Sequence, residues 1–273
     1  MTHPKHILEQ AGIEPKKSLG QNFLFDDGLL ARIVAAAELS PEDEALEVGP
    51  GLGALTRVLA RAARRVVAVE LDGRLLPVLE SELSGLDNVE LVHGDVLELD
   101  PADWFAAPYV VVANVPYYIT GAILRHLLGS WPRPRRLVLT VQREVADRLT
   151  ARPPEMSLLA VSVQHYGRVR LVSGVRAGAF WPRPEVDSAV ARIDVDARHL
   201  AARAAEADAA EAAFFRVVRA GFSEKRKQLK NNLRQLGHDD AAIVVALARA
   251  GIDGRRRAET LTVAEWASLS ELL

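Results

Sequence analysis

Cysteine is absent from this sequence, and its absence removes several classes of chemistry. Disulfides, thiolate metal sites and a cysteine nucleophile are excluded, and the composition fits a reducing compartment. The seven histidines show no metal-ligand spacing, so we expect no metal site. Ser188 lies in VDSAV, without the glycine pattern of a nucleophile elbow, which argues against a hydrolase.

Long apolar segments are also missing. Residues 1–12, MTHPKHILEQAG, have no apolar core of signal-peptide length, and no run approaches the length of a membrane span. We therefore expect a soluble, cytoplasmic protein with no membrane partner. Because no long exposed apolar stripe is evident, we also expect a monomer.

A large net charge is missing from the chain as a whole, although basic residues are concentrated locally. The formal net charge is −2 and the pI is near 6.4, which taken alone argues against a polyanionic partner. Between residues 215 and 234, however, many basic residues accompany only one acid, Glu224. This cluster predicts contacts to phosphates, and a solvated helix face is the alternative interpretation. The basic residues with this predicted role are Lys225, Arg226, Lys227 and Lys230.

Two further groups of arginines lie at residues 133–148 and 255–257. The first is a second basic stretch. For the second, a phosphate-binding and a solvated surface role both remain open.

Short apolar runs alternate with helical patterns through most of the chain, which has 49% hydrophobic and 26% charged residues. This alternation predicts βαβ units and an α/β fold with a Rossmann-like parallel sheet covered on both faces. The predicted strands are 45–49, 65–71, 88–96, 109–115 and 136–142. The predicted helices are 27–39, 54–63, 73–83 and 121–131. Two later strands, 168–175 and 188–196, are expected at the edge of this sheet.

The composition changes near residue 196, where an alanine-rich segment without strand signals begins. Helical patterns follow, including 241–251 and 262–273. We therefore expect an α/β domain over 1–200, with an N-terminal arm at 1–25, and a small all-helical domain over 201–273.

A glycine-rich loop, LEVGPGLGALT, lies between the first predicted strand and the next helix. Gly49, Gly51 and Gly53 allow a sharp turn and close approach to a ligand. Glu70 ends the next strand about twenty residues later, as in a dinucleotide-binding fingerprint, where an acid binds ribose hydroxyls. Ordinary turn glycines are the alternative interpretation of an isolated loop of this kind.

Two features argue against a nicotinamide dinucleotide. The spacing is G-x-G-x-G rather than G-x-G-x-x-G, and Glu47 precedes the loop by two residues. A carboxylate beside the glycines repels a pyrophosphate but suits the ammonium group of S-adenosylmethionine. Asp95, in GDV at the next strand end, is placed to accept from an adenine amino group. An NAD-dependent dehydrogenase is a more distant alternative.

The fourth predicted strand ends in Asn114-Val115-Pro116-Tyr117, at the same edge as the glycine loop. The Asn114 side-chain oxygen accepts hydrogen bonds, and Pro116 keeps the Val115 carbonyl out of a helical turn. Tyr117 offers a flat face for stacking. Two acceptors beside a stacking ring suit the exocyclic amine of a nucleobase, whose nitrogen they aim at a methyl donor. A plain turn is the alternative interpretation of Asn and Pro here.

These segments together resemble the ribosomal RNA adenine dimethyltransferases, most of all those that act on bacterial 16S rRNA. The resemblance spans nearly the whole chain. The segments that carry it are KKSLGQNFL, LEVGPGLGALT, VELD, GDV, NVPYYIT, QREVADRL, FWPRPEVDSAV and FSEKRKQLKNNL. It implies dimethylation of N6 of two adjacent adenines in a hairpin near the 3′ end of 16S rRNA in the small ribosomal subunit, with S-adenosylmethionine as the methyl donor.

The resemblance also implies roles for individual residues. Asn22 and Leu24 would close over the donor, Gly49 would contact its methionine part, and the roles of Glu70 and Asp95 agree with those given above. Phe180 would line the face of the target base opposite Tyr117. The resemblance assigns no role to Trp181.

Two other functions remain as alternatives to the 16S dimethyltransferase. A ribosome-assembly factor would act mainly by binding to the immature subunit. A 23S rRNA adenine-N6 methyltransferase of the macrolide-resistance type is a close enzymatic rival, but that group is strongly basic and tends to have asparagine at the position of Asp187.

Overall fold

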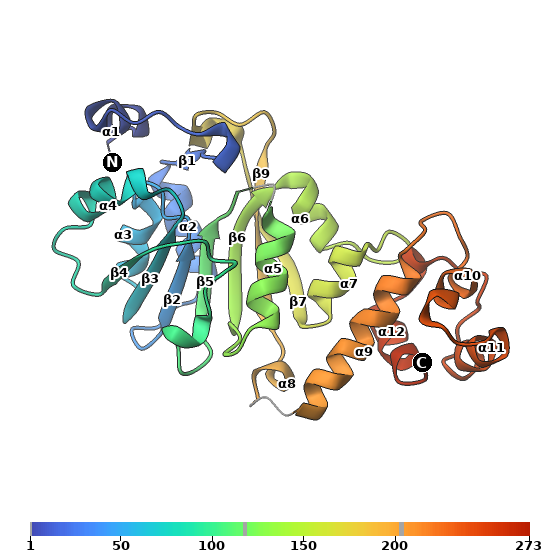
Figure 1. Ribbon diagram of the computed structural model, residues 1–273. Helices are drawn as coiled ribbons and strands as arrows, with labels where there is room; N and C mark the ends of the chain where they lie inside the picture. The colour runs from blue at the N-terminus through green and yellow to red at the C-terminus, as the bar shows by residue number, and fades with distance from the viewer. Residues whose placement is uncertain (1, 117–118, 202–204) are drawn as a thin grey trace. The chain divides into compact units, whose positions relative to one another are not determined.

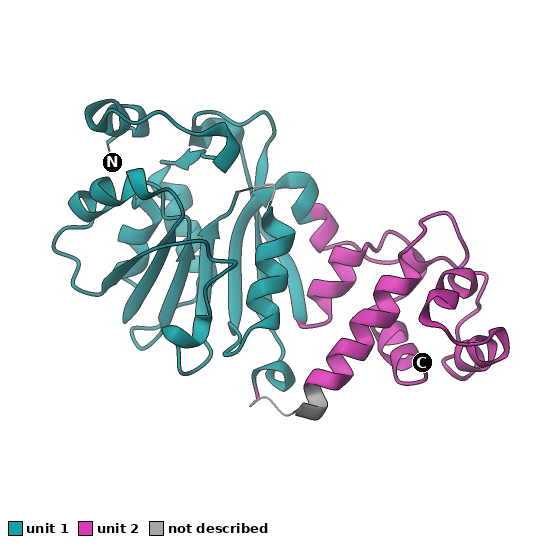
Figure 2. Ribbon diagram, in the orientation of Figure 1, with its two compact units in different colours: residues 1–146, 167–200 teal, residues 147–166, 201–273 magenta. Residues whose placement is uncertain are grey.

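The computed structural model describes residues 2–116, 119–201 and 205–273 (Figure 1). The chain forms two compact units, which Figure 2 distinguishes by colour. The first comprises Met1–Ala146 and Gly167–Leu200, and the second comprises Asp147–Tyr166 and Ala201–Leu273. In these described residues, no helix is long and apolar enough to span a bilayer.

A central sheet organises the first unit, with the strand order β4-β3-β2-β5-β6-β9-β7. The five strands from β4 to β6 pair in parallel, whereas β9 pairs antiparallel with both β6 and β7. This arrangement confirms the predicted α/β fold and its late edge strands. The strands are β2 (Glu44–Val48), β3 (Arg65–Glu70), β4 (Val89–His93), β5 (Val110–Asn114), β6 (Arg136–Gln142), β7 (Gly167–Val175) and β9 (Ser188–Val195).

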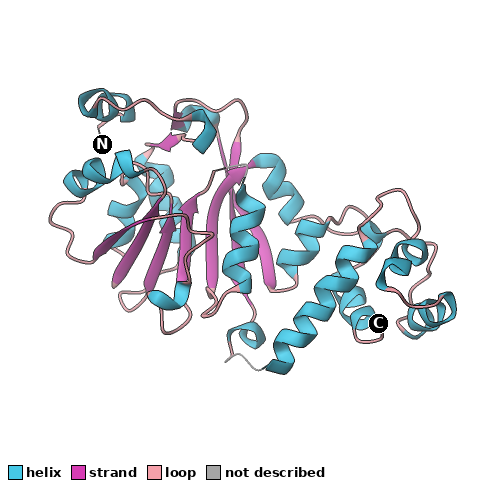
Figure 3. Ribbon diagram, viewed as in Figure 1, coloured by secondary structure: helices cyan, strands magenta, loops and turns pink. Residues whose placement is uncertain are grey.

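Helices cover both faces of the sheet (Figures 1 and 3). α2 and α3 bury leucine, isoleucine and valine side chains against the valine-rich strands, and α5 lies on the opposite face. Apolar residues at helical spacing make these helices amphipathic, so burial of their apolar faces holds the layers together. The helices are α2 (Asp27–Ala37), α3 (Ala54–Ala60), α4 (Leu76–Glu82), α5 (Thr120–Gly129), α6 (Arg143–Leu149) and α8 (Ala197–Leu200).

The N-terminal segment contains structure that the sequence patterns did not indicate. Helix α1 (Pro4–Ala11) is followed by the short strand β1 (Phe23–Leu24), which pairs antiparallel with β8 (Phe180–Trp181). Ile7, Leu8 and Phe23 are buried in one cluster with Leu52 and Leu75. The N-terminal segment is therefore packed onto the first unit rather than extended as a free arm.

Two arginines of the second basic stretch form ion pairs within the first unit. Arg135 lies 2.7 Å from Asp43, and Arg136 lies 2.7 Å from Asp194. Arg192, only 5% exposed, also pairs with Asp194 at 2.8 Å. Arg136 and Arg192 therefore link the neighbouring strands β6 and β9 to each other through Asp194.

The second unit is helical, and it includes a segment that the sequence patterns did not place there. Met156, Ala160 and Val161 from residues 147–166 share a buried cluster with Phe214 and Trp266. Burial of this apolar face explains why α7 groups with the C-terminal helices, in addition to the predicted residues 201–273. The helices are α7 (Leu158–Gln164), α9 (Ala205–Gly221), α10 (Leu229–Leu233), α11 (Asp240–Arg249) and α12 (Val263–Ser270).

Candidate functional site

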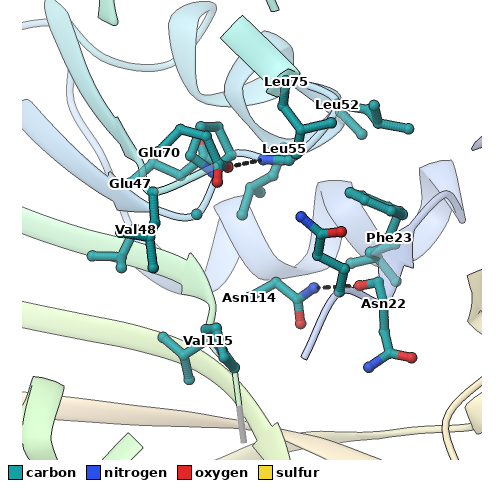
Figure 4. Close-up of a pocket in the computed structure, with 18 of the residues that line it drawn as sticks. Asn22, Phe23, Glu47, Val48, Leu52, Leu55, Glu70, Leu75, Asn114 and Val115 are labelled. Carbon is teal, nitrogen blue, oxygen red and sulfur yellow. Dashed lines mark hydrogen bonds between the residues drawn. The ribbon is translucent and has the colours of Figure 1, made fainter. Parts of the chain in front are cut away.

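A cavity lies at the carboxyl ends of the parallel strands in the first unit (Figure 4). Its walls include residues 47–52 at the end of β2, 69–71 at the end of β3, 94–96 after β4 and 114–116 at the end of β5. Residues 19–25 of the N-terminal segment line it from another direction. Strand order reverses at β2, and ligands of open α/β sheets bind in the crevice at such a switch point.

The glycine loop takes a conformation that requires glycine. Gly49, Gly51 and Gly53 have φ values of 70°, 59° and 75°, in the left-handed region. A Cβ atom at Gly51 would lie 2.9 Å from the Phe23 ring, and one at Gly53 would lie 2.9 Å from Leu83. Gly49 and Gly51 line the cavity, whereas the close neighbour of Gly53 is a leucine of the apolar cluster behind the loop.

Glu70 ties the glycine loop to the end of β3. Its Oε2 accepts from the Gly51 amide at 3.1 Å, and its Oε1 accepts from the Asp72 amide at 2.8 Å. The side chain is 6% exposed, and this burial raises the pKa of the carboxyl group above its usual value. Main-chain amides therefore hold both carboxylate oxygens in place, and the carboxyl group can still accept from a ligand hydroxyl.

Glu47 is a buried carboxyl group with an unsatisfied atom. It is 1% exposed, and its Oε2 has no hydrogen-bond partner among the described residues. Burial and, to a lesser extent, the nearby Glu70 carboxylate together raise the pKa of Glu47 to about 8. Burying such a group without a partner is costly. A ligand that brings a cationic amine into the cavity would satisfy it.

Asp95 lies beyond β4, where it also lines the cavity. Its Oδ1 accepts from the Leu97 amide at 2.9 Å, which fixes the carboxylate relative to the loop. Leu71, next to Glu70, is 45% exposed and lines the same cavity. An acceptor and an apolar surface are together the features that a planar adenine needs.

The side-chain amide of Asn114 has one defined orientation. Its Nδ2 donates to the main-chain oxygen of Asn22 at 3.0 Å, as the dashed line in Figure 4 shows. The Oδ1 atom is therefore on the side of the amide that does not contact Asn22, which suits the predicted acceptor role. Val115, 2% exposed, donates its own amide to Thr140 at 3.3 Å, and Pro116 follows it in the cavity wall.

Most of the predicted donor- and base-binding residues come together in the wall of this cavity. They are Asn22, Leu24, Glu47, Gly49, Gly51, Glu70, Asp95, Asn114, Val115 and Pro116. Tyr117 lies outside the described residues. Gly53 and Phe180 are not among the residues that line the cavity.

Phe180, predicted to line the face of the target base opposite Tyr117, lies outside the lining of the donor cavity. It is 3% exposed and belongs to the same buried cluster as Leu24 and Leu30. Its main chain pairs with Leu24 in the small β1–β8 sheet. Phe180 therefore packs in the same apolar cluster as the wall residue Leu24. Trp181 pairs with Phe23 and packs against the N-terminal apolar cluster, so its contacts hold the N-terminal segment.

The predicted phosphate-binding residues lie in the second unit, largely in the turn between α9 and α10. Lys225, Arg226 and Lys227 are exposed, and Lys230 is half-buried in α10. The Lys227 Nζ atom lies 2.7 Å from Glu224. Lys225, Arg226 and Lys227 thus lie in an exposed turn, and not on the solvated helix face that was the alternative interpretation.

The arginines at 255–257 differ among themselves. Arg255 pairs with Asp253 at 2.9 Å, whereas Arg256 is half-buried and bonds to Glu265 and to the Thr260 main-chain oxygen. Arg256 therefore has a structural role that the sequence left open.

Sequence reasoning missed two polar residues beside the cavity, Gln21 and Asp72. Asp72 is 4% exposed, and its Oδ2 accepts from Gln21 Nε2 at 2.8 Å. Both residues lie in segments that carry the family resemblance, QNFL and VELD. An acid two residues after Glu70 was a usable signal, because buried acids need partners.

The cavity suits S-adenosylmethionine by its chemistry. Glu47 offers an unpaired carboxyl oxygen, and an ammonium group beside it would favour its ionised form. Glu70 offers lone pairs for ribose hydroxyls, and Asp95 offers an acceptor for an adenine amine. Three acids in one wall disfavour a pyrophosphate.

The sequence is similar to known RNA methyltransferases over most of its length. A family model described as ribosomal RNA adenine dimethylase matches residues 13–273. A protein of Dehalococcoides mccartyi (strain CBDB1) named Ribosomal RNA small subunit methyltransferase A is 44% identical over 272 residues, covering 98% of this chain and 92% of that protein.

Two solved structures share the fold. The crystal structure of the 23S rRNA methyltransferase ErmE has a TM-score of 0.73 and 32% identity, covering 92% of this chain and 99% of that chain. A dimethyladenosine transferase from Plasmodium falciparum has a TM-score of 0.77 at 23% identity, covering 90% of this chain and 95% of that one. The second likeness supports the fold alone.

Proposed function

This chain belongs to the ribosomal RNA adenine dimethylase family, and we propose that it dimethylates N6 of two adjacent adenines near the 3′ end of small-subunit 16S rRNA. The family model covers nearly the whole chain, and the small-subunit relative is 44% identical. The methyl donor is S-adenosylmethionine, which supplies an electrophilic methyl group when it is bound.

The observation that carries this proposal is the orientation of Asn114. Its Nδ2 is committed to the Asn22 main-chain oxygen, so its Oδ1 is the atom left to accept from a target amine. The Val115 carbonyl, just before Pro116, is the second acceptor. Two acceptors that hold the amine hydrogens direct the nitrogen lone pair outward and stabilise the positive charge that develops on that nitrogen. A base within a duplex must leave its stack to reach this position.

The remaining wall residues hold the donor and keep it oriented. Glu47 pairs with the ammonium group, Glu70 accepts from ribose hydroxyls, and Asp95 accepts from the adenine amine. Asn22 and Leu24 close the N-terminal side. Because the glycine loop has no side chains at Gly49 and Gly51, its main chain approaches the methionine part of the donor closely.

The second unit contributes RNA contacts through Lys225, Arg226, Lys227 and Lys230. Three of these side chains are exposed, which favours contacts with phosphates. We also propose that the protein is a monomer. A ribosomal substrate favours a cytoplasmic location for the reaction.

The presence of aspartate rather than asparagine at position 187, in the loop before β9, supports the small-subunit assignment over a 23S substrate. Asp187 Oδ1 accepts from the Ala177 amide at 2.9 Å, and the Asp187 main-chain oxygen accepts from the Arg143 amide at 3.0 Å. The carboxylate thus closes a loop in a position where the macrolide-resistance group tends to have asparagine.

The direct test is to incubate the protein with labelled S-adenosylmethionine and unmethylated small subunits, with 23S rRNA in parallel, and to map the modified nucleotides. We expect dimethyladenosine at two adjacent positions of the 16S hairpin. Label in 23S rRNA alone would contradict the substrate. An assembly role independent of chemistry would instead appear as normal subunit maturation with a folded, inactive variant.

A further inference from the structure

Residues 14–22 of the N-terminal segment are anchored by side-chain contacts beside the donor cavity. Gln21 closes the segment on itself, since its Oε1 accepts from the Lys16 amide at 2.6 Å. Gly20, Gln21 and Asn22 line the cavity. The position of these residues therefore determines how completely the donor is enclosed.

One buried carboxylate, that of Asp72, is the hub of these contacts. Its Oδ2 accepts from Gln21 Nε2 at 2.8 Å, and its Oδ1 lies 3.9 Å from Lys16 Nζ. Arg74 pairs with the same carboxylate at 2.6 Å and donates to the Glu14 main-chain oxygen at 3.2 Å. The Arg74 guanidinium and then the Gln21 amide hold the pKa of Asp72 well below its usual value, so the carboxylate is charged at neutral pH.

The Asp72 contacts connect the two halves of the active site. The Asp72 amide donates to Glu70 Oε1 at 2.8 Å, on the donor side. Gln21, bonded to Asp72, precedes Asn22, whose main-chain oxygen accepts from Asn114 at 3.0 Å. A short path of hydrogen bonds and one peptide unit thus runs from the ribose-binding acid to the amide that holds the target amine.

We propose that Asp72 is a positioning residue that fastens residues 14–22 beside the donor and, through the Asn22 carbonyl, fixes the orientation of the Asn114 amide. This inference rests on the proposed function, because it takes the cavity as the binding site of S-adenosylmethionine. We call these contacts of Asp72 the latch. Its loss opens one wall of the cavity, so S-adenosylmethionine is released faster and binds more weakly. It also frees the Asn114 amide to rotate and thereby slows methyl transfer.

Asp72 could act only by stabilising its own turn. This role can be distinguished from the anchoring of residues 14–22, because the chain contains a second copy of the same turn. Asp253-Gly254-Arg255 in the second unit repeats Asp72-Gly73-Arg74. Asp253 accepts from the Arg255 amide at 3.0 Å and from its side chain at 2.9 Å, as Asp72 does from Arg74. The Asp253 side chain, however, is 49% exposed, against 3% for Asp72.

The test compares the full-length Asp72→Asn and Asp253→Asn variants. In the protein without donor, hydrogen exchange of residues 14–22 should accelerate in Asp72→Asn and stay unchanged in Asp253→Asn. By calorimetry, the Kd for S-adenosylmethionine should rise about tenfold or more in Asp72→Asn, since hydrogen bonds to charged groups are lost. Exchange and Kd equal to those of the wild type in a folded Asp72→Asn variant would overturn the proposal.

Exchanging the hydrogen-bond donor and acceptor between Gln21 and Asp72 distinguishes a positioning role of Asp72 from a general effect on stability. Gln21→Glu keeps the acceptor for the Lys16 amide but sets a second carboxylate against Asp72, so residues 14–22 should exchange faster. Combining Gln21→Glu with Asp72→Asn restores a donor–acceptor pair with the roles reversed. We expect the double variant to recover slow exchange and most of the donor affinity, relative to Gln21→Glu. Equal loss in the single and double variants would contradict the latch.

The exchange measurement needs no donor, so the two proposals fail separately. A wild-type protein that does not bind S-adenosylmethionine, together with the expected exchange pattern, would remove the proposed function and leave the anchoring role of Asp72 intact. Normal donor binding without the exchange difference would remove only the latch.

Discussion

Asn22 and Asn114 lie 92 positions apart in the chain, and the Asn114 Nδ2 atom donates to the Asn22 main-chain oxygen at 3.0 Å. An asparagine amide presents a donor at one end and an acceptor at the other. Because the Nδ2 end already donates a hydrogen bond to Asn22, the Oδ1 end remains to accept one from the substrate. The N-terminal segment and the end of β5 therefore build the acceptor site together.

Replacing Asn114 with alanine should lower methyl transfer much more than donor binding. The variant loses an acceptor that acts on charge developing during the reaction, so we expect a fall in kcat of about 10²-fold or more. Single-turnover transfer to unmethylated subunits and calorimetry with S-adenosylmethionine measure the two effects. Equal losses of transfer and donor binding would contradict the role given to Asn114.

Replacing Gly51 with alanine should weaken both donor binding and stability. Gly51 has a φ of 59°, and its new Cβ would lie 2.9 Å from the Phe23 ring. The strain of a left-handed conformation alone costs about 1–2 kcal/mol. Gly85→Ala is the matched control, because Gly85 has a φ of 84° with nothing within 4 Å. We expect both variants to lose stability, but only Gly51→Ala to raise the Kd for the donor.

In the absence of S-adenosylmethionine, the buried Glu47 should cause the stability of the protein to decrease as the pH rises. Its pKa is raised from 4.5 to about 8, so between these values the unfolded chain has lost a proton that the folded chain retains. The unfolded state then binds fewer protons, and the free energy of unfolding decreases with pH.

The Glu47→Gln variant removes this titration. We expect its stability relative to the wild type to increase from pH 4.5 and to level off above about 8, with a total on the order of a few kcal/mol. Thermal unfolding across this pH range measures the difference, with the exposed Glu80→Gln variant as a control. A difference that does not change with pH would rule out Glu47 as the titrating group.

Neutralising Lys225 and Arg226 together should weaken RNA binding and reduce its dependence on salt. Each lost phosphate contact lowers the slope of log K against log salt by about 0.7–0.9. Binding of the 16S hairpin region at several salt concentrations measures this slope. Arg249→Gln, an exposed arginine of the same unit outside the cluster, should leave the slope unchanged. An unaltered slope in the double variant would place the phosphate contacts elsewhere.

Sequence patterns predicted the long elements of the sheet well. The apolar runs at 109–115 and 136–142 became β5 and β6. Strands β1 and β8 have two residues each, which is too short for any periodicity to appear. Their pairing depends on burial of Phe23 and Phe180 in separate apolar clusters, and that information is distributed over distant parts of the chain.

Local sequence determined which residues stand at the strand ends, because glycines, acids and an Asn-Pro stretch follow apolar runs in a regular order. Parallel strands then bring Glu47, Glu70 and Asn114 to one edge of the sheet whatever the remaining chain does. Only the tertiary structure decided which end of the Asn114 amide faces the Asn22 carbonyl, that Asp72 is buried against Gln21, and that Phe180 is buried in the apolar cluster of Leu24. Such decisions depend on partners far apart in the chain, whose approach is set by packing rather than by any local pattern.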